Sequence, residues 1–224
     1  MDLFWRISVA ALAAYVLGSI PFAVIVGRLF WGVDVREHGS GNTGATNVLR
    51  VFGPAPGFAV LALDAAKGAA AVYVATLIAP LAFGPEGHDW FRIVGALGAI
   101  AGHSSSPFTG FKGGKGVATA TGAIVVMAPR VIPVLIVVFV LATALGRMVS
   151  LGSVTIALLV PVTTALLYPG RHSLLAFAFA AAALVVWRHR SNIRRIIHGE
   201  EAKITFRRRL LDESGWRKKR KKGN

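Results

Sequence analysis

The sequence has no cysteine, few acidic residues and a low proportion of charged residues. Of its 224 residues none is cysteine, 10 are Asp or Glu, and 16% are charged. Without cysteine, the chain cannot form a disulfide framework, a thiolate metal site, a cysteine nucleophile or a haem attachment. The six histidines are scattered along the chain, which disfavours a metal-binding cluster. We therefore predict no cofactor and no bound metal.

The residues that are present combine high hydrophobicity with a strong positive charge. The chain is 54% hydrophobic with a formal net charge of +15. Residues 188–224 hold 14 of the 25 Lys and Arg and 4 of the 10 acidic residues, so they carry +10. Residues 1–187 contain only 17 charged residues. This distribution is typical of a membrane protein with a basic tail, and it disfavours a soluble nucleic-acid binder.

Seven apolar segments are candidates to cross a bilayer, which needs about 20 residues per helix. The sequence therefore predicts an all-α integral membrane protein with about seven transmembrane helices, six or eight being the alternatives. Residues 1–204 would form the polytopic membrane domain and residues 205–224 a basic cytoplasmic tail. The N-terminal segment lacks a clear cleavage site and is expected to be retained. The seven segments are 4–27, 55–83, 91–107, 117–129, 131–147, 153–168 and 173–188.

The distribution of basic residues predicts an orientation in the membrane. With seven spans, the two long polar connections and the tail fall on one face, which carries 21 Lys and Arg. The opposite face carries four: Arg6, Arg92, Arg130 and Arg171. The positive-inside rule then places the tail and both long connections in the cytoplasm and the N-terminus outside. We expect the tail to attract anionic lipid.

The first long connection contains the segment GSGNTGATN, followed three residues later by Arg50. Its glycines allow close backbone approach, and successive N–H groups can form an anion-binding nest. Arg50 can offer a bidentate contact to a phosphate. The alternative is a flexible turn between spans. The candidate residues of the segment are Gly39, Ser40, Gly41, Asn42, Thr46 and Asn47.

The second long connection, residues 103–116, opens a polar segment, residues 103–119, that reads HSSSPFTGFKGGKGVAT. Its Lys112-Gly113-Gly114-Lys115 stretch combines glycine amides with two ammonium groups, as a phosphate cradle would. It is not a Walker A loop, because a glycine follows Lys115 where that motif needs Ser or Thr. His103 is a candidate proton carrier or phosphate ligand. The alternative is a flexible basic loop.

The third polar segment, residues 189–204, reads HRSNIRRIIHGEEAKI and opens the basic tail. On a continuing helix, His189 and Asn192 are three residues apart and share a face. This arrangement would allow both side chains to contact one ligand. The alternative is a basic helix lying on the membrane surface.

Some polar residues lie within or beside the apolar segments, where ionisable groups are costly. Asp64 and Lys67 are one helical turn apart, and we expect an internal ion pair with a structural role rather than a catalytic one. Asp34 and Arg36 are expected to brace the first connection. Ser150, in an inside turn, either faces the site or caps a helix.

The three polar segments, in this order, resemble the bacterial acyl-phosphate-dependent glycerol-3-phosphate 1-O-acyltransferase family of the PlsY type. The family pattern is G-S-G-N-x-G-A-T-N-V-x-R, then G-H and F-K-G-G-K-G-V-A-T, then H-R-x-N-I-x-R-L-x-x-G-x-E. The resemblance covers about residues 15–204. The chain departs from the pattern at Ser105-Ser106, where the family usually has Phe-Pro, and at Ile196, where Leu is common. The matching stretches are Gly39–Arg50, Gly102-His103 with Phe111–Thr119, and His189–Glu201.

The resemblance implies a multi-pass enzyme of the bacterial cytoplasmic (inner) membrane, with its active site facing the cytoplasm. It would transfer an acyl chain from acyl phosphate to the sn-1 hydroxyl of glycerol 3-phosphate. The products are lysophosphatidic acid and phosphate, in the first acylation step of phospholipid biosynthesis. Its partners would be these two substrates and membrane lipid, without nucleic acid. The rival hypotheses are a transporter of organic phosphates and a non-catalytic lipid-binding protein.

On this hypothesis the catalytic candidates are Ser40, Arg50, His189 and Asn192. The first segment would position substrate phosphate and hydroxyl groups, while His189 and Asn192 orient the attacking glycerol 3-phosphate. The general base stays open between His189, His103 and a substrate phosphate. Glu201 would brace the tail helix against an arginine of an inside loop. The remaining substrate-binding candidates are Gly39, Gly41, Asn42, Thr46, Asn47, His103, Lys112, Gly113, Gly114, Lys115 and Ser150.

Overall fold

The computed structural model describes residues 3–80 and 84–204, without the side chains of residues 85 and 86. Within these ranges the regular structure is entirely helical. The chain divides into a smaller unit, Pro21–Leu63, and a larger unit that joins the N-terminal segment up to Ile20 with Asp64–Ile204. The predicted basic tail, residues 205–224, lies outside the described residues.

The smaller unit contains the first polar segment. It comprises α2 (Phe22–Trp31), a 3-10 turn η1 (Val35–Glu37), α3 (Ala45–Phe52) and the first part of α4 (Pro54–Ile78). Its core is a cluster of buried side chains that includes Val35, Val48 and Val60. Trp31 stacks on Phe52, with ring centroids 4.6 Å apart. This core holds the ends of the polar segment in fixed positions.

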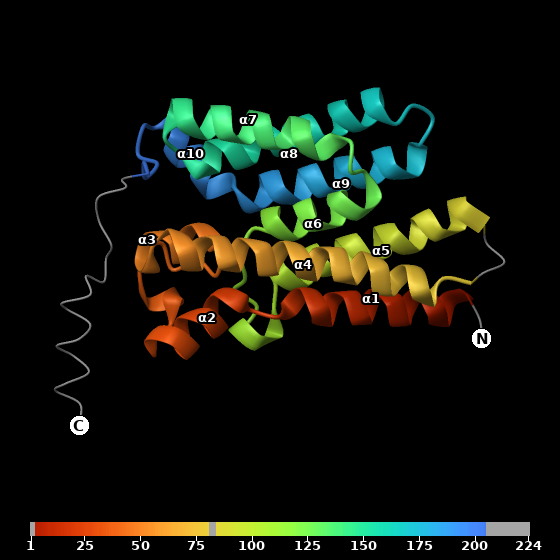
Figure 1. Cartoon of the computed structure of the whole chain (residues 1–224), viewed down its shortest axis with the longest axis horizontal. Coiled ribbons are helices and arrows are strands. Elements are labelled where there is room, and N and C mark those ends of the chain that lie inside the picture. The colour runs from red at the N-terminus through yellow and green to blue at the C-terminus, as the bar shows by residue number, and fades with distance from the viewer. Residues whose placement is uncertain (1–2, 81–83, 205–224) are drawn as a thin grey trace. The chain divides into compact units, whose positions relative to one another are not determined.

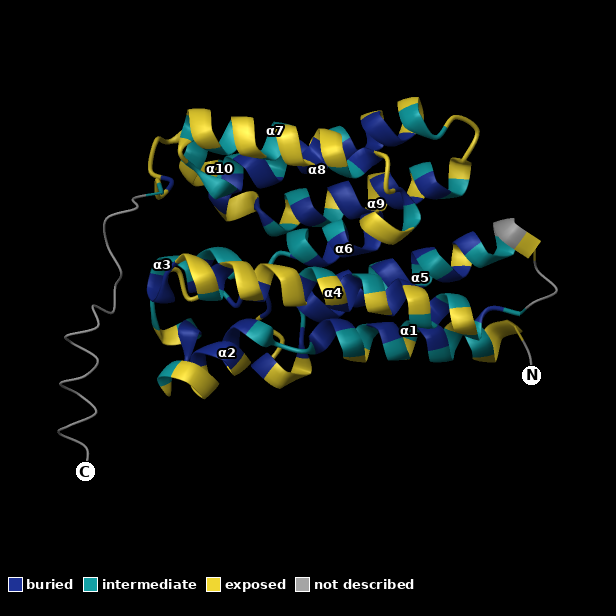
Figure 2. Cartoon of the chain, in the orientation of Figure 1, coloured by how far each residue is buried: buried dark blue, intermediate teal, exposed yellow. Residues whose placement is uncertain are grey.

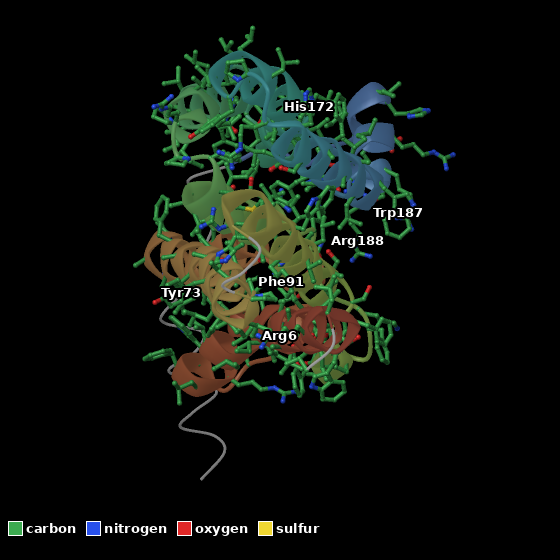
Figure 3. All side chains as sticks on the ribbon, turned by 90° about the vertical axis from the view of Figure 1, so that its right-hand side faces the viewer. Arg6, Tyr73, Phe91, His172, Trp187 and Arg188 are labelled. Atoms are coloured by element: carbon green, nitrogen blue, oxygen red, sulfur yellow. The ribbon has the colours of Figure 1, made fainter. Side chains whose placement is uncertain are left out.

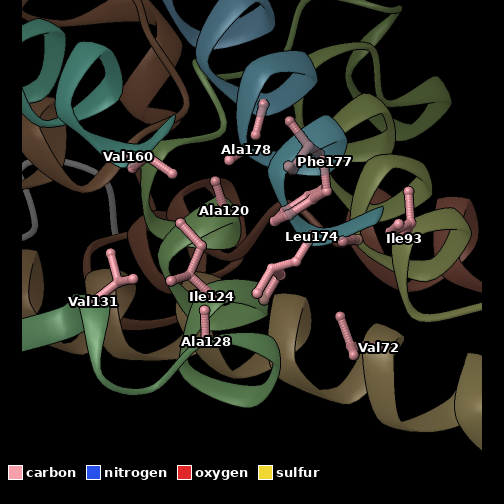
Figure 4. Close-up of a cluster of buried hydrophobic side chains, with 14 of the residues drawn as sticks. Val72, Ile93, Ala120, Ile124, Ala128, Val131, Val160, Leu174, Phe177 and Ala178 are labelled. Atoms are coloured by element: carbon pink, nitrogen blue, oxygen red, sulfur yellow. The ribbon is translucent and has the colours of Figure 1, made fainter. Parts of the chain in front are cut away.

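The larger unit is a set of long helices (Figure 1). Helices α1 and α5 lie side by side, and α8 packs between α7 and α9. Figure 4 shows part of its main apolar cluster, in which Phe177 and Leu174 of α9 meet Ile124 of α6. Besides the second part of α4, the helices are α1 (Leu3–Ser19), α5 (Gly84–Ser104), α6 (Val117–Met127), α7 (Val131–Gly146), α8 (Val149–Leu167), α9 (His172–Arg188) and α10 (Arg190–Ile197).

Glycines allow several helices of the larger unit to approach closely. A Cβ on Gly122 of α6 would overlap the backbone of Ala65, and one on Gly68 of α4 would overlap Thr119. Gly102 of α5 lies in the same way against the backbone of Tyr15. Small residues at helix contacts are typical of membrane proteins, because lipid supplies little hydrophobic driving force between helices.

Buried Asp89 connects helices at one end of the larger unit, the end opposite its polar segments. This carboxylate accepts hydrogen bonds from Arg171 and Ser173, which lie just before and within α9. Arg92 also donates to it, over 3.3 Å. At the same end Arg6 of α1, labelled in Figure 3, donates to the carbonyl of Ile78 over 3.0 Å. These bonds tie α5 to α9 and α1 to α4.

The helical surface is rich in large apolar side chains, as a bilayer requires. Exposed residues run along α7 and one side of α8 (Figure 2), among them Val137, Leu141 and Leu145. Three stretches are long and apolar enough to span a membrane: Leu3–Trp31, Pro54–Ile78 and Val149–Leu167. Helices α9 and α10, bent by 61°, form a fourth if taken together. The all-helical membrane class is supported, whereas the count of seven spans stays a prediction.

Several helix bounds differ by a few residues from the expected segments, and α5 begins seven residues earlier than expected. Two larger differences have physical reasons. The predicted segment 4–27 is interrupted after Ser19, because Pro21 lacks an N–H donor and disfavours helical geometry at the preceding residue. The first long connection contains helix α3, which sequence analysis treated as loop. Helix α3 has only eight residues and follows a polar glycine-rich segment, so its amphipathic pattern was too short to predict a helix.

Candidate functional site

In the smaller unit, Asn47 organises the first polar segment. Its side chain is buried at the start of α3, with 1% of its surface exposed. Its Nδ2 donates to the carbonyls of Val35, His38 and Asn42 over 2.9–3.1 Å. Its Oδ1 accepts from the Ser40 N–H over 2.8 Å. Asn47 therefore shapes the loop from inside and presents Ser40 at the surface.

Two glycines make this loop geometry possible. Gly39 and Gly41 have φ of +62° and +69°, in the left-handed region that glycine adopts without steric cost. A Cβ on Gly39 would overlap the Asn47 amide. Gly39, Ser40 and Gly41 are exposed, while Asn42, Thr46 and Arg50 are half-buried. The residues expected to bind substrate therefore border an accessible, well-defined loop.

Asp34 braces the start of the same segment, as its sequence position suggests. Its carboxylate accepts hydrogen bonds from Arg36, through both the side chain and the backbone N–H, and from Arg28 over 2.8 Å. The Arg36 guanidinium, opposed by burial and assisted by Arg28, holds the pKa of Asp34 well below its usual range. Asp34 therefore stays ionised and holds both arginines near the loop.

In the larger unit, the second polar segment folds back onto the end of α5. The N–H groups of Gly113 and Gly114 donate to the carbonyls of Ser104 and His103 over 3.2 and 3.0 Å. These two amides, expected from the sequence to face a phosphate, are thus engaged within the protein. Lys112 is exposed and Lys115 half-buried, so the lysines remain the phosphate-facing candidates of this segment.

Beneath this segment lies a buried ionisable cluster. Lys67 Nζ lies 2.8 Å from Asp64 Oδ1, so the expected ion pair is present, and Lys67 also donates to the Ile20 carbonyl. His103 Nδ1 lies 3.6 Å from the same carboxylate oxygen. A Cβ on Gly114 would overlap the His103 ring at Nε2. His103 thus supports the glycine segment from below.

His189 lies at the bend between α9 and α10, with 2% of its surface exposed. Its Nδ1 lies 2.8 Å from the Val185 carbonyl, which can only accept a hydrogen bond. Nδ1 therefore carries the proton, and in the neutral ring Nε2 is the nitrogen with a free lone pair. The 61° bend interrupts the continuous helix on which the sequence placed His189 and Asn192, although the His189 carbonyl still accepts from the Ile193 N–H over 2.8 Å.

Glu201 connects the third polar segment to the start of α8. Its Oε1 accepts from Ser150 Oγ and Asn192 Nδ2, each over 2.7 Å, and its Oε2 accepts from Arg195 over 2.7 Å. The arginine that Glu201 contacts is Arg195 of α10 itself and not one of an inside loop, as was expected, whereas the contact with Ser150 reaches α8. Asn192 Oδ1 is buried without a hydrogen-bond partner among the described residues. Glu201 therefore fixes the orientation of the Asn192 amide.

Arg188, which precedes His189 at the end of α9, was not among the predicted site residues. Its guanidinium donates to the carbonyls of Gly113 and Gly114 over 2.9–3.2 Å. Figure 3 labels Arg188 beside Trp187, whose ring centroid lies 5.8 Å from the guanidinium carbon. The sequence feature that could have identified Arg188 is its position directly before the candidate residue His189. This position is weak evidence for a role in the site, because positively charged residues are common at the cytoplasmic ends of membrane spans.

The predicted residues thus gather in two places. In the smaller unit, Asn47 holds the loop that carries Ser40, with Arg50 on α3. In the larger unit, Arg188 joins the glycine and lysine segment to the helix end that carries His189. Ser150 belongs to the Glu201 cluster and is buried, like Asn192. Both places combine basic side chains with glycine-rich backbone, which suits phosphate-bearing ligands.

Comparison with known proteins agrees with this chemistry. Residues 8–199 match the family model described as glycerol-3-phosphate acyltransferase. A glycerol-3-phosphate acyltransferase of Synechococcus sp. (strain JA-3-3Ab) is 45% identical, covering 87% of this chain and 92% of the relative. One from Anaeromyxobacter sp. (strain K) is 44% identical, covering 91% and 98%.

Two solved structures have the same fold. Both are of PlsY, described as an integral membrane glycerol 3-phosphate acyltransferase, in its glycerol 3-phosphate and lysophosphatidic acid forms. They superpose with TM-scores of 0.80 and 0.79 at 35% and 33% identity, covering 92% of this chain and 99% of each structure. Fold and motifs together define an integral membrane acyltransferase of phospholipid biosynthesis. The chain belongs to the glycerol-3-phosphate acyltransferase family.

Proposed function

We propose that the protein transfers an acyl chain from acyl phosphate to the sn-1 hydroxyl of glycerol 3-phosphate. The hydroxyl oxygen attacks the acyl carbonyl carbon, and the bond from that carbon to the phosphate oxygen breaks. The products are 1-acyl-glycerol 3-phosphate and inorganic phosphate. The main support for this proposal is a contact of Arg188, the residue before His189. Its guanidinium donates hydrogen bonds to the Gly113–Gly114 backbone and so connects the lysine-bearing segment to the helix end with His189. Acyl phosphate is already activated, so positioning and charge stabilisation supply much of the rate.

The roles of the site residues follow from their surroundings. Arg50 and Ser40, beside the loop shaped by Asn47, hold substrate phosphate and hydroxyl groups. Lys112 and Lys115 hold the acyl-phosphate group and stabilise the phosphate as it leaves. Asn192, oriented by Glu201, directs its amide oxygen at the attacking substrate. Basic side chains at developing negative charge are the expected form of stabilisation for this reaction.

Of the two histidines, the geometry favours His189 as the proton acceptor. The lone pair on its Nε2 is available because Nδ1 is bonded to Val185. The corresponding nitrogen of His103 faces Gly114 instead. In the proposed reaction the hydroxyl proton passes to His189 Nε2 or to the departing phosphate. His103 has a supporting role.

A small apolar pocket between α6, α7, α8 and α9 is the proposed contact site for part of the acyl chain. It begins near the polar segments, since Val117 follows Gly116, Ser153 lies one turn after Ser150, and Val185 lies one turn before His189. Small residues, including Ala157 and Ala181, line it further along. Replacing Ala157 with Leu would fill this pocket and leave less room for the chain. We expect the preferred acyl phosphate to become shorter, measured by the ratio of kcat/KM for palmitoyl and decanoyl phosphate.

The proposed location is the bacterial inner membrane, with seven spans and the site facing the cytoplasm. Three or four stretches meet the length and hydropathy needed for a span, and the proposal assigns further spans to α5 and to α6 and α7, which are apolar but shorter. The outward-facing N-terminus rests on the distribution of Lys and Arg. The basic residues of 205–224 would bind anionic lipid at the inner surface.

Single substitutions in each unit test the proposed site. Arg50→Ala and His189→Ala are each expected to lower kcat/KM by about 100-fold, the typical loss for one stabilising or proton-transferring group. Arg194→Ala serves as the matched control, because Arg194 is an exposed arginine of α10. The measurement is phosphate release from palmitoyl phosphate in the presence of glycerol 3-phosphate. Turnover in either variant equal to the control would remove that residue from the site.

A further inference from the structure

The Gly113–Gly114 segment has all four of its polar backbone groups bonded within the protein. Both N–H groups donate to carbonyls at the end of α5, and both carbonyls accept from Arg188. In an extended chain, successive carbonyls point in opposite directions. Here both meet one guanidinium, whose planar arrangement of donors suits two neighbouring acceptors. The contact with Arg188 therefore selects one backbone conformation for this segment.

The opposite side of the segment rests on the end of α5. A Cβ on Gly113 would overlap the carbonyls of His103 and Ser104, and one on Gly114 would overlap the His103 ring. The ring itself is held beside Asp64, with Nδ1 3.6 Å from the carboxylate. The favourable tautomer turns an N–H toward that negative charge and leaves Nε2 facing Gly114. The segment is thus held from both sides, by Arg188 and by the pair Asp64–His103.

The charge of Arg188 is not compensated within this contact. Carbonyl groups offer only dipoles, and across the described part of the chain no carboxylate lies within salt-bridge distance of this guanidinium. A half-buried uncompensated cation raises the positive potential around it. Lys115 follows Gly114, and His189 follows Arg188, so two proposed site residues lie in the region of raised positive potential.

We propose that Arg188 is a positioning residue that fixes the Gly113–Gly114 segment and thereby sets Lys115 against His189. The kinetic part of this inference rests on the proposed function. Arg188 does not itself contact the reacting atoms. It holds the segment so that the lysine ammonium meets the acyl-phosphate group, and its own charge favours that anion.

The kinetic test compares Arg188→Lys and Arg188→Gln with the control Arg194→Gln. Arg188→Lys keeps the charge but not the paired contact, and Arg188→Gln loses both. We expect kcat/KM for palmitoyl phosphate to fall about 10- to 100-fold in Arg188→Gln, the range for a hydrogen bond from a charged group. The KM for glycerol 3-phosphate should change much less, and Arg188→Lys should recover part of the loss. The proposal would be overturned if kcat/KM fell equally for palmitoyl phosphate and glycerol 3-phosphate. It would also be overturned if the fall in activity were fully explained by a smaller fraction of folded protein.

A second test is independent of catalysis. Because the chain has no cysteine, cysteines replacing exposed Lys112 and Arg194 can carry spin labels without background. We expect a narrow distance distribution between the labels with Arg188 present and a broader one with Arg188→Gln. An unchanged distribution refutes the positioning role, even if the enzyme is active. If the broadening occurs but no acyl transfer is found in the unsubstituted protein, the positioning role stands and the proposed function fails.

Discussion

At the scale of single residues, the strongest constraint on the first polar segment comes from Asn47. The pattern GSGNTGATN indicated a loop that binds phosphate, with Asn47 as one contact among several. The structure gives Asn47 four hydrogen bonds inside the loop and leaves Ser40 exposed. Sequence spacing could identify the segment, but it could not distinguish a side chain that builds the loop from one at its surface.

Replacing Asn47 should therefore damage the fold as well as the activity. Asn47→Ala leaves three carbonyls, of which that of Val35 is buried, and one N–H without this partner, at a cost of about 1–3 kcal/mol for each buried group that stays unsatisfied. We expect a clear drop in the thermal unfolding midpoint in detergent. Asn42→Ala is the control, because Asn42 takes part through its backbone carbonyl. Equal midpoints for the two variants would contradict the role assigned to Asn47.

Glu201 gives a prediction for pH dependence. Burial opposes its ionisation, but hydrogen bonds from Ser150, Asn192 and Arg195 outweigh burial and lower the pKa of Glu201 below the ordinary 4.5. A lowered pKa in the folded state means that the ionised carboxylate stabilises the protein above about pH 4.5 and that this contribution is lost as pH falls through the folded-state value. Glu201→Gln should be less stable than the unsubstituted protein at pH 7, with a gap that narrows below pH 4.5.

The comparison of unfolding midpoints across pH 3.5–7 checks this prediction. Glu200→Gln is the matched control, since Glu200 is an exposed carboxylate one position away. A gap between Glu201→Gln and the unsubstituted protein that stays constant across this range would show that the charge of Glu201 does not stabilise the fold.

At the scale of elements, most helices were predictable and the breaks between them were less so. The apolar segments expected at 131–147 and 173–188 are α7 (Val131–Gly146) and α9 (His172–Arg188). Hydrophobic content identifies such helices because it is their dominant property. The bend of 61° at His189 was not predictable, since neither proline nor glycine marks it in residues 185–193 and the local sequence gives no other signal. Arg188 was missed for the same reason, because its partners are backbone carbonyls far away in sequence.

Helix contacts made through glycine give a prediction at this scale. Gly122→Val would force α6 away from α4, because its side chain would overlap the backbone of Ala65. We expect a fall in stability of about 1–3 kcal/mol, as for other overpacked sites, measured by unfolding in detergent. The control is Gly44→Ala, whose Cβ would meet no atom within 4 Å. If Gly122→Val is as stable as this control, the close contact is not important for stability.

At the scale of the whole molecule, the uneven distribution of Lys and Arg predicts how the protein is oriented in the membrane. This orientation can be tested with single introduced cysteines, because the chain has none of its own. Single cysteines replace exposed Arg130, expected outside, and exposed Lys112, expected inside. A membrane-impermeant maleimide should label Arg130→Cys in intact spheroplasts and Lys112→Cys only after permeabilisation. The opposite pattern, or equal labelling of both sites, would contradict the proposed topology.

The family and the membrane class were predictable because three long motifs occur in order along an apolar chain. The donor and the position of acylation do not follow from the family alone, and they form the central claim. The most direct test supplies purified protein with glycerol 3-phosphate and either palmitoyl phosphate or palmitoyl-CoA, and analyses the products. We predict equal amounts of 1-palmitoyl-glycerol 3-phosphate and phosphate from palmitoyl phosphate, and none of the lipid from palmitoyl-CoA. Folded protein that forms no lysophosphatidic acid from palmitoyl phosphate would contradict the account.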